Sequence, residues 1–534
     1  AGDVDFFAGV VEEGLRACAE LIKKRALEDA AVAAACGAAG AIIATAGTTT
    51  ALLVWRAAFR NYPSHRSSLL EDWLDVARNE GRAKTTRVQL DDDLGGASSW
   101  SSVLALVVTQ AAVPEGDGVP SMTESDRCCQ ALAGALLRRS REGPQEPEWR
   151  ELALTFAADL VAALEAPAWT ASAESLVRAL ARATSTELRK ASQDKKSEAY
   201  VGFLGDLLSV IVGGVSSVTK RATVSVKPVV EETEGACQMP EENQRLEARV
   251  AFQQLQLNGL EVRSATEPLL QEALRFCVAK WHAELPESAK ALKRHLAAQM
   301  DGRDVARVRR ASWDAALPRD KLRGVSAAIV ASSPLARGLI QLAKQLVGLL
   351  AHQQPKVRDK ALRALGRAAC DHLLERNVVQ QAMRSRFADE SPSVRLAAVE
   401  VCGDNCQRQP ELFVLYEEDL LKRLRDAGLA VRKATARRLK ATLTDSRIPP
   451  DARARTLSAL VRCAARPGEE RTVKDLVRDA VREAWFASVQ APRPTQPLPR
   501  VSPVTTSEPR PAQVVEPASL DPITRQVVDV VHAA

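Results

Sequence analysis

Two short segments in the last third of the chain are crowded with lysine and arginine, the residue types that bind phosphate groups. The seven residues are Lys422, Arg423, Arg425, Lys433, Arg437, Arg438 and Lys440. No aromatic side chain is interleaved with them, so the charge suits contact with the phosphate backbone of duplex nucleic acid rather than the reading of base edges. We therefore predict a DNA-binding surface here, although a solvated basic face explains the same residues equally well.

The distribution of charge along the chain concentrates the basic surplus in this part. Residues 351–486 contain 27 lysines and arginines against 19 aspartates and glutamates, a local surplus of eight positive charges. The 534 residues together carry a net charge of +6, so the rest of the chain is slightly acidic. The whole-chain charge says little about partners, whereas this segment favours a polyanionic one.

Catalytic chemistry has no comparable support in the sequence. There is no Walker A loop, no Gly-x-Ser-x-Gly, and no cluster of histidine, cysteine and carboxylate residues, so we predict no catalytic residue, no cofactor, no metal site and no enzyme. The ten cysteines include no Cys-x-x-Cys pair, and Cys128-Cys129 and Cys402 with Cys406 are the only close pairs. A reducing compartment with ordinary buried thiols follows.

The elements that must position the basic residues are expected to be helices. Aromatic residues make up only 4% of the chain and there are three tyrosines, while alanine, leucine, arginine and glutamate are abundant. Helix formers thus dominate over the residues that favour strands. An all-α fold is predicted.

A repeat of 37 residues specifies the kind of helical fold. A Val-Arg step recurs as Val357-Arg358, Val394-Arg395 and Val431-Arg432. Five residues before each valine stands a polar turn residue, which is His352, Asp389 or Asp426, and small or apolar residues follow four and eight positions later. This period and pattern are typical of stacked helix pairs, so a HEAT-repeat α-solenoid is predicted, with the second helix of each pair starting near the Val-Arg step.

The arginines of these steps are interpreted as structural. In stacked helix pairs an arginine at this position commonly pairs with an aspartate of a neighbouring repeat. Here Asp389 and Asp426 are the aspartates available to Arg395 and Arg432, and Arg358 occupies the same position one repeat earlier. A ladder of these five residues is favoured over contact with a ligand.

The chain divides into five expected segments. Residues 1–212 form an N-terminal helical block, 213–263 a mobile linker or insertion, and 264–487 a HEAT-repeat block. Residues 488–518 are expected to be a disordered proline-rich loop, and 519–534 the start of a truncated next helix. The uncharged stretch from Ala30 to Trp55 is long enough to cross a bilayer, but its alanine and glycine content favours a helix pair buried in the solenoid, without a membrane.

Several separated segments resemble the Nipped-B-like, or adherin, family of cohesin loaders, in the same order along the chain. They are Phe59–Arg66, Leu69–Asp72, Ala166–Glu174, Arg275–His282, Ala388–Glu400, Arg408–Leu412, Leu429–Lys433, Ala484–Phe486 and, cut short, Ile523–Ala533. The match is strongest around Ala388–Glu400. The sequence departs from the family in its high alanine and arginine content and in the segment 213–258, which has no clear counterpart.

The resemblance implies a hook-shaped solenoid that binds double-stranded DNA and the cohesin complex, through its SMC heads and kleisin. It implies stimulation of cohesin's ATPase during loading onto chromatin for sister chromatid cohesion, in the nucleus. The chain would be an internal piece of the loader, and the site for the tetratricopeptide partner subunit would lie upstream of it. The alternative is a cytoplasmic HEAT or armadillo adaptor, or a transport scaffold, that binds peptides along a concave surface.

Overall fold

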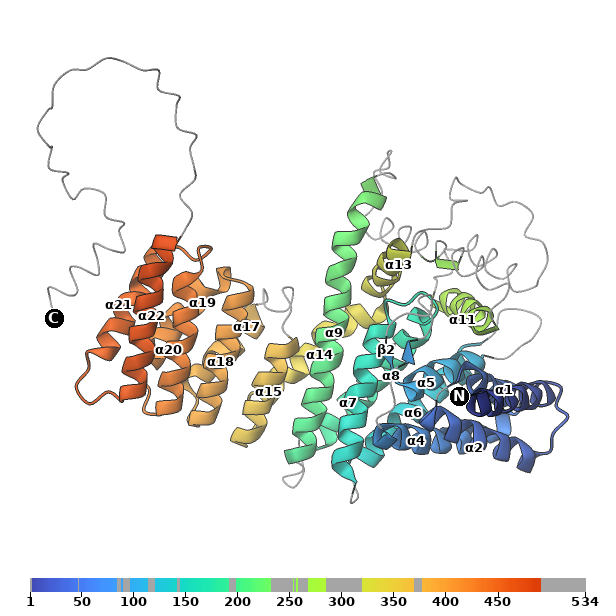
Figure 1. Ribbon diagram of the computed structural model, residues 1–534. Coiled ribbons are helices and arrows are strands. Elements are labelled where there is room, and N and C mark those ends of the chain that lie inside the picture. The colour runs from blue at the N-terminus through green and yellow to red at the C-terminus, as the bar shows by residue number, and fades with distance from the viewer. Residues whose placement is uncertain are drawn as a thin grey trace, which may run out of the picture. The chain divides into compact units, whose positions relative to one another are not determined.

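The computed structural model of the chain consists of two compact units, Ala1–Leu349 and Leu350–Ala534 (Figure 1). The residues described are 2–46, 48–83, 88–89, 97–113, 121–141, 145–191, 198–231, 253, 256–257, 268–284, 319–368 and 377–490. The predicted 519–534 helix and nearly all of the predicted 488–518 loop lie outside them. The hook shape depends on how the units are placed and stays a prediction.

The first unit consists almost entirely of helices. They are α1 Gly2–Lys23, α2 Asp29–Thr45, α3 Thr49–Asn61, η1 Pro63–His65, α4 Arg66–Ala83, α5 Trp100–Ala111, α6 Thr123–Arg141, α7 Glu146–Ala163, α8 Thr170–Ala191, α9 Glu198–Glu231, α11 Pro268–Glu284, α13 Arg319–Ala331 and α14 Pro334–Leu349. The strands found in the described residues are β1 Val88–Gln89 and β2 Ala97–Ser98, which pair antiparallel. The predicted all-α fold is confirmed.

The uncharged stretch near the N-terminus folds as two helices. The hydroxyl of Thr48 accepts a hydrogen bond from the Ala51 amide at 3.2 Å and caps α3, so the chain turns between α2 and α3 instead of continuing as one span. Trp55 is fully buried, and its indole Nε1 donates to the Cys36 carbonyl of α2 at 3.0 Å. Both helices are shorter than a bilayer crossing requires.

One described helix segment, Glu198–Ala222 of α9, is long and apolar enough to cross a bilayer, and 72% of its most apolar window is buried in the protein. The pair Arg323–Ala331 and Pro334–Leu349 passes the same test only when joined, across a bend of 58°. The burial of Glu198–Ala222 is typical of a helix in the core of a folded protein.

The prediction of a mobile linker beginning at residue 213 is wrong for residues 213–231, because α9 continues through them without a break. Val215, Val218 and Ala222 are buried, and α9 packs against α7, α8, α13 and α14. Valine, serine and threonine weaken helix propensity here and blur the apolar spacing, yet packing on several helices overrides that local preference. Residues 232–252 lie outside the described part.

The expected boundary at residue 264 also differs from the structure. Helices α11, α13 and α14 belong to the first unit, which ends at Leu349. Helix α11 is attached by Lys280, whose ammonium donates to the Ala171 carbonyl at 2.7 Å and to the Ser175 hydroxyl at 2.9 Å and pairs with Glu174. The repeat with the Val-Arg steps thus begins with α15 (Pro355–Ala368), the first helix of the second unit.

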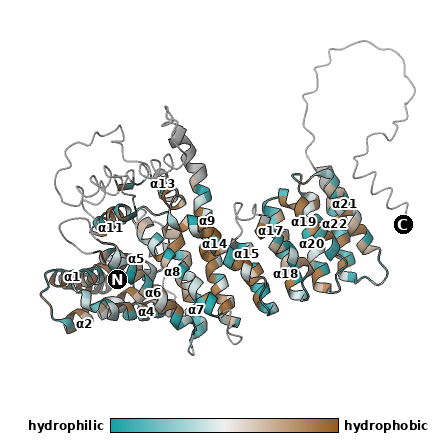
Figure 2. Ribbon diagram, turned by 180° about the vertical axis from the view of Figure 1, so that it is seen from behind, coloured by the Kyte–Doolittle hydropathy of each residue, from teal (hydrophilic) through white to brown (hydrophobic). Residues whose placement is uncertain are grey.

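The second unit is a regular stack of helix pairs. Its elements are α15 Pro355–Ala368, α17 Asn377–Ser385, η3 Arg386–Ala388, α18 Pro392–Arg408, α19 Glu411–Arg423, α20 Leu429–Thr444, α21 Pro450–Ala464 and α22 Arg471–Gln490. Helices α15, α18, α20 and α22 pack side by side in one layer, and α19 and α21 pack in the other. Each helix carries hydrophobic and hydrophilic residues, as amphipathic helices in a stack do (Figure 2). Residues 488–490 extend α22 and are not part of a loop.

Two glycines 37 residues apart allow neighbouring helices of this stack to approach closely. A Cβ atom at Gly366 would lie 2.5 Å from Val401 Cγ1, and one at Gly403 would lie 2.6 Å from Arg438 Cγ. Both contacts are too close for a side chain. The next equivalent position, in α20, is Lys440.

Candidate nucleic-acid interface

The turn before α18 is organised around one carboxylate that two arginines share. Arg358 reaches across from α15, with its Nε 2.9 Å from Asp389 Oδ2 and its Nη2 2.7 Å from Oδ1. Arg386 donates from Nη1 to Asp389 Oδ2 at 3.2 Å. The Ser391 amide donates to Oδ1 at 3.0 Å and fixes the turn just before α18. The aspartate therefore connects one helix pair to the preceding one.

The same arrangement recurs one repeat later. Arg395 donates from Nε and Nη2 to the two oxygens of Asp426, each at 2.8 Å. Arg423 adds a third contact at 3.0 Å, and the Gly428 amide donates to Oδ1 at 2.8 Å. Arg423, which the sequence suggests as a DNA-binding residue, thus lies within the stack's own ion pairs.

A third carboxylate continues the series with glutamate in place of aspartate. Arg432 Nε donates to Glu469 Oε1 at 2.9 Å, and Arg466 Nη1 donates to Oε2 at 3.3 Å. Sequence reasoning misses Glu469 because it follows Asp426 by 43 residues instead of 37. The recurrent Arg-x-x-acid signal, which starts at Arg386, Arg423 and Arg466, would have found all three turns.

Each of these Val-Arg arginines also fastens the turn of its own repeat. Arg395 Nη1 donates to the carbonyls of Asp389 and Glu390, at 2.9 and 3.0 Å. Arg358 and Arg432 make the equivalent pair of bonds in their own turns. One guanidinium therefore satisfies backbone acceptors in one repeat and a carboxylate in the next, so most of its five N–H donors serve the stack itself.

Electrostatics in these turns favour the charged aspartates. Burial alone would raise the pKa of Asp389, but hydrogen bonds from Arg358 and the Ser391 amide, together with the charges of Arg358 and Arg386, hold its pKa below the usual 3.8. Asp426 has a lowered pKa for the same balance of reasons. Its side chain is 1% exposed and that of Arg395 12% exposed, so water screens this pair little.

Most of the seven basic candidates have acidic partners in the structure. The five ion pairs are Lys422–Glu418 (2.7 Å), Arg423–Asp426 (3.0 Å), Lys433–Glu470 (3.6 Å), Arg438–Asp404 (2.5 Å) and Lys440–Glu483 (2.6 Å). Arg425 and Arg437 are exposed, and neither side chain forms an ion pair within the described residues of the second unit. The surplus charge is thus partly used in joining helices.

The structure separates the candidates into two places. Lys422, Arg423 and Arg425 lie at the end of α19 and in the turn that follows. Lys433, Arg437 and Lys440 are spaced by four and three residues, which places them on one face of α20. Arg437 lies at the centre of this set, which we call the α20 face.

Helix α15 presents further basic residues that were not among the predicted DNA-binding residues. Lys356, Lys360, Arg363 and Arg367 follow at spacings of four, three and four residues, so they share a face. Arg363 Nη1 pairs with Glu400 of α18 at 2.7 Å, while Lys356 and Lys360 are exposed and unpaired within the described residues. Their spacing of three and four residues in the sequence would have predicted this shared face.

The described residues offer no competing chemistry in the form of metal ligands. No group of three or more histidine, cysteine or acidic residues within them could hold a metal ion. The thiols of Cys36 and Cys277 are buried, which raises their pKa to about 12 and leaves them protonated at neutral pH.

Comparison with known proteins gives one consistent result. No protein-family model matches the chain. It is similar to Nipped-B-like protein A of Danio rerio, with 25% identity over 498 residues that cover 80% of this chain and 20% of that protein. Nipped-B-like protein of Homo sapiens is 23% identical over 403 residues, which cover 67% of this chain and 14% of that protein. The chain thus spans about a fifth or less of the length of these relatives.

A solved structure shows the same fold. The C-terminal fragment of the cohesin loader SCC2 of Chaetomium thermophilum superposes with a TM-score of 0.67, covering 89% of this chain and 40% of that chain at 19% identity. The helical-repeat solenoid predicted from the 37-residue period is confirmed.

Proposed function

Because the chain belongs to the Nipped-B-like cohesin-loader family, we propose that it is part of a scaffold that promotes the loading of cohesin onto chromatin. The observation that carries this proposal is the similarity to Nipped-B-like proteins over 80% of the chain. The proposed partners are the cohesin complex, through its SMC heads and kleisin, and double-stranded DNA, and the proposed location is chromatin in the nucleus. The chain acts by binding, and cohesin itself hydrolyses the ATP.

The proposed DNA contact is the α20 face together with the exposed lysines of α15. Arg437, Lys356 and Lys360 have no acidic partner within the described residues, so they can meet a phosphate without breaking an existing pair. Lys433 and Lys440 are paired, but their partners Glu470 and Glu483 are partly exposed. Exposed ion pairs contribute little free energy, so a phosphate can replace the carboxylate.

Charge reversal at the unpaired residues tests the DNA contact. The triple variant carries Lys356→Glu, Lys360→Glu and Arg437→Glu, and these changes leave no buried acid without its partner. Each phosphate contact that the variant loses should reduce the slope of log affinity against log salt concentration by about one. A gel shift with duplex DNA across salt concentrations measures this slope. Arg462→Glu is the matched control, because Arg462 is exposed on α21 of the other helix layer and has no ion pair within the described residues.

The loading role is tested separately from DNA binding. Adding the full-length protein to cohesin and DNA should raise the rate of ATP hydrolysis, and fluorescence microscopy should find the protein in nuclei. No stimulation of the ATPase, or exclusion from nuclei throughout the cell cycle, would refute the loading role. If the salt slope of the triple variant were unchanged, the DNA contact would be refuted and the three residues would be interpreted as a solvated basic face.

A further inference from the structure

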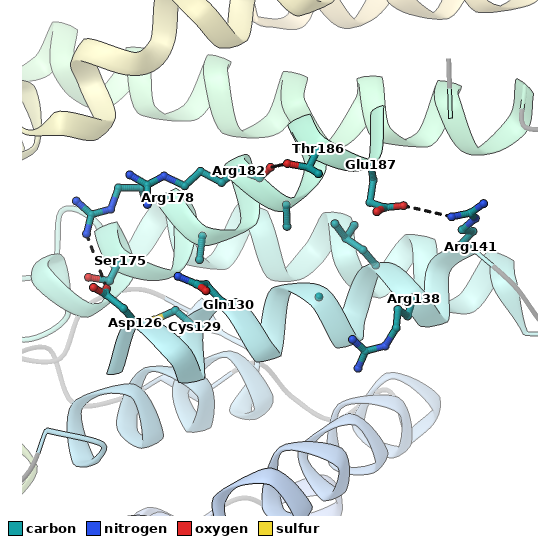
Figure 3. A pocket seen from close by; sticks show the side chains of 14 residues that line it. Asp126, Cys129, Gln130, Arg138, Arg141, Ser175, Arg178, Arg182, Thr186 and Glu187 are labelled. Carbon is teal, nitrogen blue, oxygen red and sulfur yellow. Dashed lines mark hydrogen bonds and ion pairs between the residues drawn. The ribbon is translucent and has the colours of Figure 1, made fainter. Parts of the chain in front are cut away.

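A groove of about 670 Å³ runs between α6 and α8 on the first unit (Figure 3). Its floor contains small side chains. Gly134 of α6 and Ala179 and Ala183 of α8 line it, and a Cβ atom at Gly134 would meet only Arg138 Nη1, at 3.6 Å. The hollow exists because these residues leave space that larger side chains would fill.

Two ion pairs between the helices bracket the groove. Asp126 of α6 faces Arg178 of α8 at 4.0 Å, and Arg141 of α6 faces Glu187 of α8 at 3.5 Å. Figure 3 shows these pairs at opposite ends of the groove. Fifteen residues of α6 separate Asp126 from Arg141, which corresponds to about 22 Å along the helix.

The middle of the groove is basic and partly polar. Arg182 is exposed and has no ion pair within the described residues, and Arg138 contacts Glu71 only at 3.6 Å, with both side chains exposed. Gln130 and Thr186 add an amide and a hydroxyl. In all, four arginines and two carboxylates line the groove, a surplus of two positive charges.

We propose that this groove binds a short, extended, acidic peptide segment of a partner protein. A length of about 22 Å accommodates about seven extended residues. Arg138 and Arg182 would bind carboxylates, and the small side chains of the floor would admit the peptide. The Gln130 amide would bond the peptide backbone. The Thr186 hydroxyl donates to the Arg182 carbonyl at 2.9 Å and would accept a hydrogen bond from a peptide amide. The proposal does not rest on the cohesin-loading role.

Fluorescence anisotropy with the full chain tests the charge requirement. The probe is a fluorescein-labelled seven-residue peptide with four glutamates alternating with alanines, and a glutamine version serves as the uncharged comparison. Arg182→Glu and Arg138→Glu should each weaken binding by up to about fivefold. Arg139→Glu is the matched control, because Arg139 also faces Glu71 but does not line the groove.

Filling the floor provides a second test that does not depend on charge. Gly134→Leu occupies the groove and replaces a glycine inside a helix, so the melting temperature should stay equal or rise while peptide binding is lost. Gly338→Leu in α14, where an added Cβ meets nothing within 4 Å, should leave binding unchanged. Unaltered binding in both Gly134→Leu and Arg182→Glu, equal affinity for the glutamine peptide, or displacement by a 20-base-pair duplex would overturn the proposal.

Discussion

Arg395 holds both carboxylate oxygens of Asp426, a residue 31 positions later in the next helix pair, with two bonds of 2.8 Å. The same guanidinium holds two carbonyls of its own turn. The stack is therefore held together by its apolar core and also by side chains that form hydrogen bonds to two repeats at once. Removing one carboxylate should affect both repeats.

We expect Asp426→Asn to destabilise α18 and α20 together by about 2–3 kcal/mol, because it leaves the partly buried guanidinium groups of Arg395 and Arg423 without their counter-charge. Hydrogen-exchange mass spectrometry measures the local free energy of opening in each helix. Asp479→Asn is the control, since Asp479 forms only an exposed pair with Arg482 at 3.7 Å. Loss of protection confined to one helix would contradict the joined arrangement.

The stability of the second unit should fall in acid. Asp389 and Asp426 have pKa values lowered below 3.8 in the folded chain, so their stabilisation is present above the unfolded pKa of about 3.9. It is lost as pH falls through the lower folded values, because the unfolded chain then binds more protons. Denaturant unfolding of the second unit, measured from pH 6 to pH 2, should show this loss. The double variant Asp389→Asn, Asp426→Asn should show a shallower pH dependence, and an identical one would refute the assignment.

The sequence predicts the fold class and the repeat because the 37-residue period is carried by the helices themselves. It does not predict the extent of α9, where residues such as Val215 and Val218 show weak periodicity and are helical through tertiary packing. The 37-residue period does not predict Glu469 as a partner of Arg432, because its repeat is six residues longer. The acidic partners of Lys433, Arg438 and Lys440 lie 34 to 43 residues away in the sequence, so only their placement in space distinguishes an ion pair from a free charge.

Gly403→Ala should destabilise the second unit although alanine favours helices over glycine by about 1 kcal/mol. The new Cβ would lie 2.6 Å from Arg438 Cγ and 2.9 Å from Arg438 Cβ, so α18 and α20 would have to move apart, which costs about 1–3 kcal/mol. Differential scanning calorimetry should show a lower transition temperature. Gly348→Ala, where an added Cβ meets nothing within 4 Å, should instead leave stability equal or higher.

Lys280→Met should detach α11 from the first unit. The Lys280 ammonium is buried and satisfies Glu174, the Ala171 carbonyl and the Ser175 hydroxyl at once. Its loss leaves the buried Glu174 carboxylate with the more distant Arg178, at 4.0 Å, as counter-charge, which costs about 3 kcal/mol. Limited proteolysis should then cut within Pro268–Glu284 in the variant and spare this helix in the native chain. Adding Glu174→Gln to Lys280→Met removes the stranded charge and should restore part of the protection, whereas equal cleavage of the single and double variants would show that lost packing, and not the charge, is responsible.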